Sequence, residues 1–195
     1  MARLPTLRLF VAIELPPPVT DALARTVEGL RSTLQGPYRW VAATGIHLTL
    51  KFLGDVDGDR VDAYGTSLAT AAHHERFPLR LSGAGMFTQR GVARVVWAGL
   101  GGETESLDAL RDTVEASLVA AGATPEARAF RPHLTLARVP GRLTADRQGA
   151  LVAALAEVSF AEDAAFDVRA VSLMRSQLGR GGARYSRIAS VALAG

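Results

Sequence analysis

The sequence His-Leu-Thr-Leu occurs twice in this chain, at residues 47–50 and at residues 133–136, and the two copies lie 86 residues apart (133 − 47 = 86). In an extended strand, alternate side chains point to the same face of the sheet. Each copy therefore sends one histidine and one threonine to one face and two leucines to the other. The leucines require a core, so the imidazole and the hydroxyl are left to line a cleft. The duplication predicts two equivalent strands, each buried on one face.

Longer stretches repeat at nearly the same offset. Apolar residues at helical spacing predict two helices in each half. Apolar runs rich in strand-forming residues predict the strands around them. Each half therefore has the order strand, helix, strand with the motif, helix, strand. The expected helices are residues 19–34, 61–71, 107–118 and 151–158, and the expected strands are residues 8–12, 47–50, 77–81, 94–98, 133–136, 166–171 and 184–193, the last after a glycine-rich turn at residues 179–182.

A long period with only two copies indicates a duplicated lobe and not a solenoid. We therefore predict an α+β protein with two lobes related by a pseudo-two-fold axis. Two antiparallel sheets are expected to face a central cleft, with the helices outside. Residues 1–195 are expected to form a single domain, with lobes at about residues 1–90 and 91–195, and strands could exchange between the lobes.

Composition narrows the class of protein. A chain of 195 residues with 48% hydrophobic residues can bury a proper core. No apolar run approaches the roughly 18 residues that a membrane span needs, and the N-terminus lacks the profile of a signal peptide. The absence of cysteine excludes disulfides, zinc–thiolate sites and thiol nucleophiles. We expect a cytoplasmic protein, without contact to a membrane, that is a monomer.

The basic residues are almost all arginine. The chain holds 22 Lys and Arg residues, of which only Lys51 is lysine, and its net charge is +3. This arginine content could reflect a GC-rich genome, or it could serve phosphate binding, because guanidinium pairs well with phosphate. No long basic run is present, so tight non-specific binding of duplexes is not indicated. A short or single-stranded anionic ligand fits better.

Two histidines and two hydroxyls form a sufficient set for acid–base chemistry on a phosphate. Histidine titrates near neutrality, so one imidazole can accept a proton while the other donates one. A pseudo-two-fold axis through phosphorus would place base and acid on opposite sides for an in-line displacement. A strained cyclic phosphate diester suits this set, because its leaving alkoxide needs only a proton. Metal ligation by His47 and His133 would need carboxylates that the second motif lacks, so we expect no metal and no cofactor.

The whole chain resembles the 2H phosphoesterase superfamily, which is named for paired His-x-Thr/Ser motifs. It is most similar to the bacterial and archaeal RNA 2′,3′-cyclic phosphodiesterases, also called 2′-5′ RNA ligases. The resemblance is carried by residues 10–13, 39–41, 47–54 and 130–138, and by Ser176, Gly182 and Tyr185. It implies a bilobal fold that opens 2′,3′-cyclic phosphate ends of RNA to 2′-phosphates without metal or ATP. It also implies a reversible ligase activity that joins RNA through 2′-5′ bonds.

The resemblance also implies roles for single residues. His47 matches the acid that protonates the 3′ oxygen and His133 the base, although the residues themselves do not distinguish the two roles. Thr49 and Thr135 match the hydroxyls that hold the phosphate. Arg138 matches a phosphate-binding arginine of the family.

Strand parity complicates the position of Arg138. It lies five residues after His133 and should face away from it, so a twist or bulge is needed at the end of the strand. Arg131 shares the parity of His133 and is a second candidate for phosphate or substrate binding. Phe130 is a candidate for stacking a base, and Tyr185 is a further candidate for substrate binding.

Two alternatives remain open at this point. The chain could be an RNA-end binding module with vestigial catalysis, which would bind RNA tightly without turnover. It could also be a phosphodiesterase for another small cyclic phosphate. Rates on cyclic mononucleotides and on RNA with a cyclic end would separate these possibilities.

Overall fold

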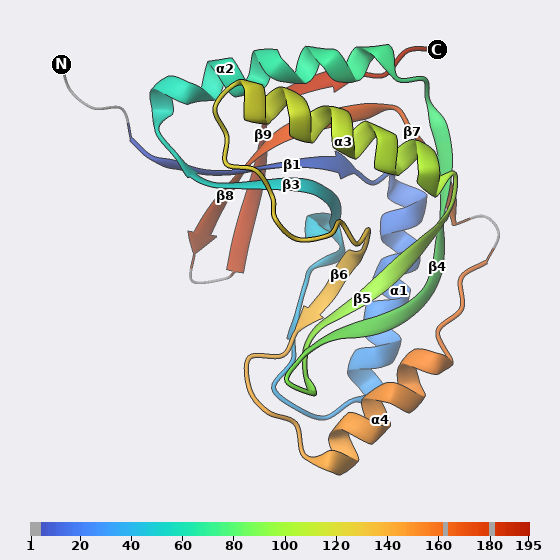
Figure 1. Ribbon diagram of the computed structural model, residues 1–195. Helices are drawn as coiled ribbons and strands as arrows, with labels where there is room; N and C mark the ends of the chain where they lie inside the picture. The colour runs from blue at the N-terminus through green and yellow to red at the C-terminus, as the bar shows by residue number, and fades with distance from the viewer. Residues whose placement is uncertain (1–4, 162–163, 180–181) are drawn as a thin grey trace.

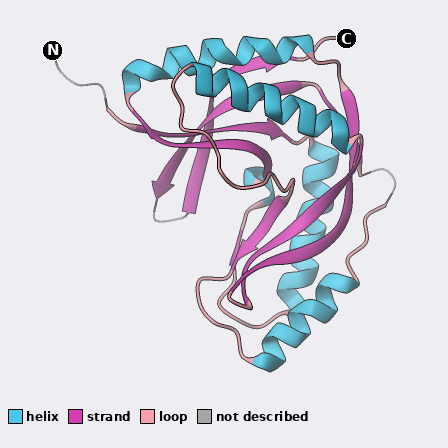
Figure 2. Ribbon diagram, viewed as in Figure 1, coloured by secondary structure: helices cyan, strands magenta, loops and turns pink. Residues whose placement is uncertain are grey.

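The computed structural model describes residues 5–161, 164–179 and 182–195. The chain has an α+β fold, as predicted (Figure 2). Its helices are α1 (Pro17–Thr33), α2 (Val61–Ser67), α3 (Thr104–Ala120) and α4 (Ala145–Ala156), with 3₁₀ turns η1 (Ala43–Gly45), η2 (Gly58–Arg60) and η3 (Leu68–His73). Its strands are β1 (Leu7–Glu14), β2 (Arg39–Trp40), β3 (His47–Val56), β4 (Phe77–Gln89), β5 (Val92–Gly102), β6 (Leu134–Arg138), β7 (Ala165–Val168), β8 (Ala170–Gly179) and β9 (Gly182–Ala192).

The strands form two antiparallel groups. The strand order is β7-β4-β5-β6-β3-β1-β8-β9, and β2 pairs with β6. We call β3, β1, β8 and β9 the first strand group, and β6, β5, β4, β7 and β2 the second strand group. Within the described residues, β3 and β6 are paired only at Leu48 and Leu134, so the two groups are joined into one sheet at a single point. Figure 1 shows the groups turning away from each other on either side of this junction.

Strands are exchanged between the two halves of the sequence. β4 comes from the first half but pairs with β5 of the second half, in a long hairpin. β8 comes from the second half but pairs with β1, where Phe10 lies opposite Met174. Each group therefore contains strands from both halves. This exchange supports the proposal that residues 1–195 form one domain with two lobes.

The strand expected at residues 166–171 is wrong as a single element. The chain forms β7, which pairs with β4, and then β8, which pairs with β1. The change falls at Arg169, whose side chain donates to Asp167 at 2.8 Å. The alternation of buried and exposed residues is broken here, since Val168 and Val171, three positions apart, are both buried. The apolar residues at 166–171 therefore do not indicate where the chain passes from one strand group to the other. The predicted turn at residues 179–182 lies partly outside the described residues.

The four predicted helices are confirmed, with the second one divided into α2 and the 3₁₀ turn η3. Proline stands at the start of α1, where its missing N–H costs no hydrogen bond. The apolar stripe of α3 is fully buried and consists of Leu107, Leu110, Val114 and Leu118. In Figure 1, α2 and α3 cover the first strand group, and α1 and α4 lie beside the second.

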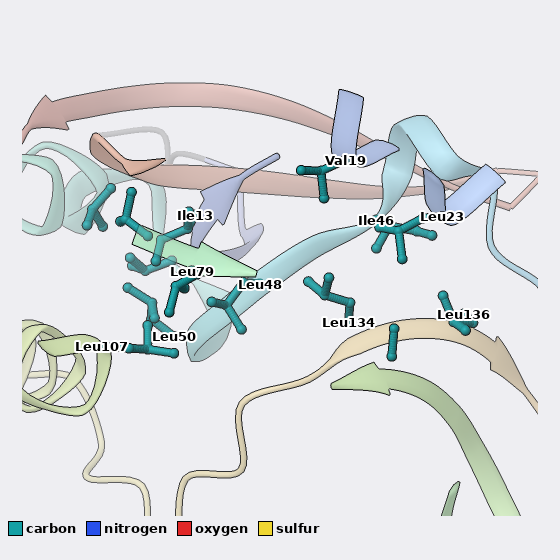
Figure 3. Packing of buried hydrophobic residues seen from close by; sticks show 14 of the residues in the cluster. Ile13, Val19, Leu23, Ile46, Leu48, Leu50, Leu79, Leu107, Leu134 and Leu136 are labelled. Atoms are coloured by element: carbon teal, nitrogen blue, oxygen red, sulfur yellow. The ribbon is translucent and has the colours of Figure 1, made fainter. Parts of the chain in front are cut away.

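The motif leucines belong to the main core, as expected from their spacing. Leu48 and Leu134 are completely buried, and Leu50 and Leu136 are buried as well. Figure 3 shows these leucines from the two motif strands within the same cluster as Ile13 and Leu107. Burial of each leucine side chain contributes roughly 1.5–3 kcal/mol. The core therefore fixes which face of each motif strand is left open. No helix within the described ranges is long and apolar enough to cross a membrane.

Candidate active site

The junction of the two strand groups brings the two motifs together. Leu48 and Leu134 are paired, and they occupy the same position in the two copies of the motif (134 − 48 = 86). An antiparallel pair has a local two-fold axis between its strands, so this axis relates one motif to the other. When the antiparallel register is extended by one residue on each side of the Leu48–Leu134 pair, His47 lies opposite Thr135 and Thr49 lies opposite His133. All four of these side chains lie on the face opposite the leucine core.

The motif strands each contain a bulge at the equivalent position. Between β5 and β6, Val96 is paired with Ala137 and Trp97 with Thr135, so Leu136 is an extra residue in β6. The pairing of β1 with β3 skips Leu50 in the same way. A bulge moves the following residues to the other face. The side chain of Arg138 consequently lies on the histidine face, as the sequence required.

Each imidazole is held by the same type of hydrogen bond. Nδ1 of His47 lies 2.9 Å from the carbonyl oxygen of Gly45, and Nδ1 of His133 lies 2.7 Å from that of Arg131. A carbonyl oxygen accepts only, so Nδ1 carries the hydrogen in both rings. Nε2 is then the nitrogen that exchanges protons, and it can serve as acceptor or donor according to the charge of the ring. Arg131 therefore positions His133 through its backbone, while its side chain is exposed.

The surroundings lower the pKa of both histidines. For His47 the largest cause is burial, opposed by the Gly45 carbonyl and by the Glu14 carboxylate, while the charges of Arg138 and His133 lower the pKa further. For His133 burial again lowers the pKa most, the Arg131 carbonyl opposes it, and the charge of Arg138 lowers it. The charge of Arg138 therefore lowers the pKa of both imidazoles, which share one face of the paired motif strands. Both rings favour the neutral form until an anion binds.

Aromatic rings lie against each imidazole. The ring of Phe10 stacks on His47 at 4.6 Å between centroids, and Tyr185 meets His47 edge-on at 4.9 Å. Phe87 meets His133 edge-on at 4.8 Å. These rings limit the orientations of both imidazoles and cover part of each. Tyr185 was a candidate from the sequence, whereas Phe10 and Phe87 were not.

A pocket of about 320 Å³ opens beside His47. It is lined by Glu14, Tyr185 and Arg187, together with Thr20, Thr44 and Met174. Arg187 donates to both oxygens of Glu14, at 2.7 and 2.8 Å, and this bond is the main cause that lowers the pKa of Glu14. The larger hollow of about 780 Å³ lies between the β4–β5 turn and α4, and it contains neither imidazole. The smaller pocket adjoins the candidate site at His47, and the site itself extends across the Leu48–Leu134 junction to His133.

Phe130 lies in a different environment from the one expected for base stacking. Its ring packs against the hydrophobic core, and the guanidinium of Arg111 lies 5.6 Å from the ring centre. The rings beside the imidazoles are therefore Phe10, Phe87 and Tyr185. A strand register would have found Phe10, since it lies on the same face of β1 as Ala12 and Glu14, and Glu14 is paired with His47. The sequence alone does not supply that register.

The hydroxyls of Thr49 and Thr135 are available for a ligand. Both side chains are half-buried, and within the described part of the chain neither hydroxyl has a hydrogen-bond partner. Together with Arg138, they provide donors on the face that holds both imidazoles. The described residues contain no group of three His, Cys, Asp or Glu side chains arranged to hold a metal ion. The site as described combines two proton-transfer groups with donors for an oxyanion.

Comparison with known families and proteins gives one consistent result. The profile of the 2′-5′ RNA ligase superfamily matches residues 18–180. The chain is 37% identical over 155 residues to an RNA 2′,3′-cyclic phosphodiesterase from Aeropyrum pernix, with 80% of this chain and 86% of that protein covered. It is 32% identical over 180 residues to a protein of the same name from Methanothermobacter thermautotrophicus, with 92% of this chain and 95% of that one covered.

Solved structures share the fold. The crystal structure of Escherichia coli LigT complexed with 3′-AMP superposes with a TM-score of 0.75 at 28% sequence identity. The superposition covers 96% of this chain and 98% of the LigT chain. The similarity in sequence and the similarity in fold therefore extend over both strand groups and both motifs.

Proposed function

Because the chain belongs to the 2′-5′ RNA ligase superfamily, we propose that it opens 2′,3′-cyclic phosphate ends of RNA to 2′-phosphates. The same site would join RNA ends through 2′-5′ bonds in the reversible direction. The observation that supports this most directly is the pairing of Leu48 with Leu134, which sets one histidine and one threonine on each side of a local two-fold axis. A phosphorus atom on that axis has a proton-transfer group on either side.

The reaction needs two proton transfers. Nε2 of His133 takes a proton from water, whose oxygen forms a bond to phosphorus. The bond from phosphorus to the 3′ oxygen breaks, and the 3′ oxygen receives a proton from Nε2 of His47. The 2′-phosphate remains. In ligation, the 5′-hydroxyl of a second RNA takes the place of water, and the energy of the strained ring drives bond formation, so no nucleoside triphosphate is consumed.

The remaining groups hold the phosphate. The hydroxyls of Thr49 and Thr135 and the guanidinium of Arg138 would donate to its non-bridging oxygens. Donors that are already oriented toward developing negative charge stabilise the transition state without reorganisation. The carbonyl oxygens of Gly45 and Arg131 keep Nε2 of each histidine turned toward the substrate.

Hydrolysis in the presence of EDTA tests this proposal. We expect the protein to convert adenosine 2′,3′-cyclic phosphate and RNA with a 2′,3′-cyclic end into 2′-phosphates at rates that EDTA leaves unchanged. Phosphorus NMR or chromatography would identify the 2′-phosphate. Formation of the 3′-phosphate, or loss of activity in EDTA, would contradict the proposed reaction. Tight RNA binding without turnover would indicate a binding module instead.

The depressed pKa values predict the pH dependence. A base must be neutral and an acid protonated, so kcat/KM is greatest between the two pKa values of the free enzyme. Both lie below the ordinary value of 6.5, so we expect a bell-shaped profile with its maximum on the acid side of pH 6.5. The anionic substrate favours imidazolium, so the kcat profile should lie at higher pH than that of kcat/KM. A flat kcat/KM profile, or a maximum above neutrality, would argue against the acid–base pair.

The same shifts affect folding. Each histidine binds a proton more weakly in the folded chain than in the unfolded chain, so stability is lost as pH falls from about 6.5 through the folded pKa values. The acid limb of the activity profile should therefore be measured with a check that the protein remains folded. We also propose that the protein is a cytoplasmic monomer, because the chain has no cysteine and each strand group is completed within one chain.

A further inference from the structure

Two arginines face each other across strands at one end of the site. Arg39 of β2 is paired with Arg138 of β6, and the next pair along is Trp40 with Ala137. Paired residues of antiparallel strands point to the same face, with Cβ atoms about 5 Å apart. Ala137 is buried and Trp40 packs against the core, so both arginines lie on the open face, where both are exposed. Like charges in this arrangement are destabilising unless an anion lies between them.

No carboxylate of the protein compensates this pair. Strands β2, β4, β5 and β6 contain no Asp or Glu. Among the described residues, neither Arg39 nor Arg138 takes part in an ion pair, and neither side chain donates a hydrogen bond. Other exposed arginines do have such partners, as Arg8 has Asp55 and Arg169 has Asp167. The pair is therefore left with uncompensated positive charge on a wall that is free of acidic residues.

The two arginines differ in their distance from the imidazoles. Arg138 lies on β6, the strand that carries the second motif, whereas Arg39 lies on β2, which pairs only with the end of β6. Leu134 and Arg138 are separated by about three strand steps, or roughly 10 Å, once the bulge is allowed for. An extended arginine side chain at 138 reaches back toward a phosphate over the junction. Arg39, across from it, is placed to meet an anion just beyond that phosphate.

The local two-fold axis is broken at this point. The residue equivalent to Arg138 in the first motif strand is Phe52 (52 + 86 = 138), which is paired with Phe10. Phe52 is 55% exposed. One end of the site therefore presents two guanidinium groups without a carboxylate, whereas the other presents an exposed aromatic ring, and Arg187 in the same row of paired residues is bound to Glu14. This asymmetry favours an RNA strand that crosses the site with its next phosphate at the arginine end.

We propose that Arg39, together with Arg138, binds the phosphate on the 5′ side of the nucleotide that carries the cyclic phosphate. This proposal rests on the proposed function, and it makes Arg39 a determinant of specificity for RNA ends over cyclic mononucleotides. Arg138 would contact both phosphates, whereas Arg39 would contact only the second. A mononucleotide with a free 5′-hydroxyl has nothing for Arg39 to bind.

The test compares two small substrates in the full-length protein, adenosine 2′,3′-cyclic phosphate and its 5′-phosphorylated form. We expect the wild type to have a kcat/KM about ten-fold or more higher for the 5′-phosphorylated substrate, as for a charge-assisted hydrogen bond. Arg39→Gln should remove this preference and leave the rate on the 5′-hydroxyl substrate unchanged. The slope of log KM against log salt for an RNA substrate should fall by about 0.7. Arg39→Lys should retain part of the preference, because it keeps the charge.

Arg25→Gln is the matched control, since Arg25 is an exposed arginine on α1 that is not part of the site. It should behave as the wild type on both substrates. An Arg39→Gln variant that keeps the preference, or that loses activity equally on both substrates, would overturn the assignment. So would a loss confined to ligation, because Arg39 would then bind the incoming strand. A wild type that hydrolyses neither substrate would instead refute the proposed function itself.

Discussion

Replacing His47 or His133 by alanine is expected to lower kcat by about 10²–10⁴-fold in each case, since each removes one proton-transfer group from the transition state. The two losses should not add. Once the base is missing, proton donation to the 3′ oxygen gains little, so the double variant should be only slightly slower than the worse single variant. Single-turnover hydrolysis of a 2′,3′-cyclic nucleotide would measure all three variants.

His73→Ala is the control for this experiment. His73 is an exposed histidine at the end of η3, outside the site, and its removal should leave kcat unchanged. Each active-site variant should also lose the one limb of the pH profile that its imidazole supplies, which would separate the acid from the base. If either single variant kept full activity, the paired acid–base mechanism would have to be abandoned.

The second large effect is expected at Lys51, the only lysine of the chain. Its side chain is buried, and Nζ donates to both oxygens of Glu115, at 2.9 and 2.8 Å, and to the carbonyl oxygen of Thr124 at 2.8 Å. Glu115 also accepts from the backbone N–H of Glu126 at 2.8 Å. This network ties β3, which carries the first motif, to α3 and to the segment that leads to the second motif.

Lys51→Met should lower the free energy of unfolding by about 3–5 kcal/mol, because the buried Glu115 carboxylate loses both hydrogen bonds from the ammonium and keeps only the more distant Arg111, at 3.8 Å, as a cationic partner. Urea unfolding at neutral pH would measure the loss. The double variant Lys51→Met with Glu115→Met should recover a large part of it, because both members of the buried pair are then removed and Arg111 keeps Asp112 at 3.0 Å. A loss below about 1 kcal/mol in the single variant would mean that the pair behaves as an exposed one.

The helices, the motif strands and the open face of these strands could be predicted from the sequence, because they depend on local periodicity. The stripe from Leu107 to Leu118 and the alternation of His47, Leu48 and Thr49 each describe one element, and the structure has them as expected. The need for a bulge before Arg138 followed from the same parity argument. The position of the bulge at Leu136 could not be predicted, because it depends on how β6 pairs with β5.

Features that depend on pairing between distant strands were not predictable. Shifting the chain by 86 residues aligns Phe10 with Val96. In the structure Phe10 is paired with Phe52, and the equivalent pair in the second half is Val95 with Arg138, so Phe10 corresponds to Val95. A shift of one residue turns every side chain to the other face, so the alignment could not place Phe10 beside His47. The position of Glu14 opposite His47 depends on the same register.

The exchange of β4 and β8 has a consequence for how the protein is made. A ribosome releases β1 and β3 early, yet β8, the second neighbour of β1, begins more than 110 residues after the end of β3 (170 − 56 = 114). Until then β1 offers an unpaired edge to any strand nearby, which is a known route to aggregation. Such distant pairing also slows folding after synthesis ends. The edge of β1 in the nascent chain therefore has to stay protected until β8 has been synthesised.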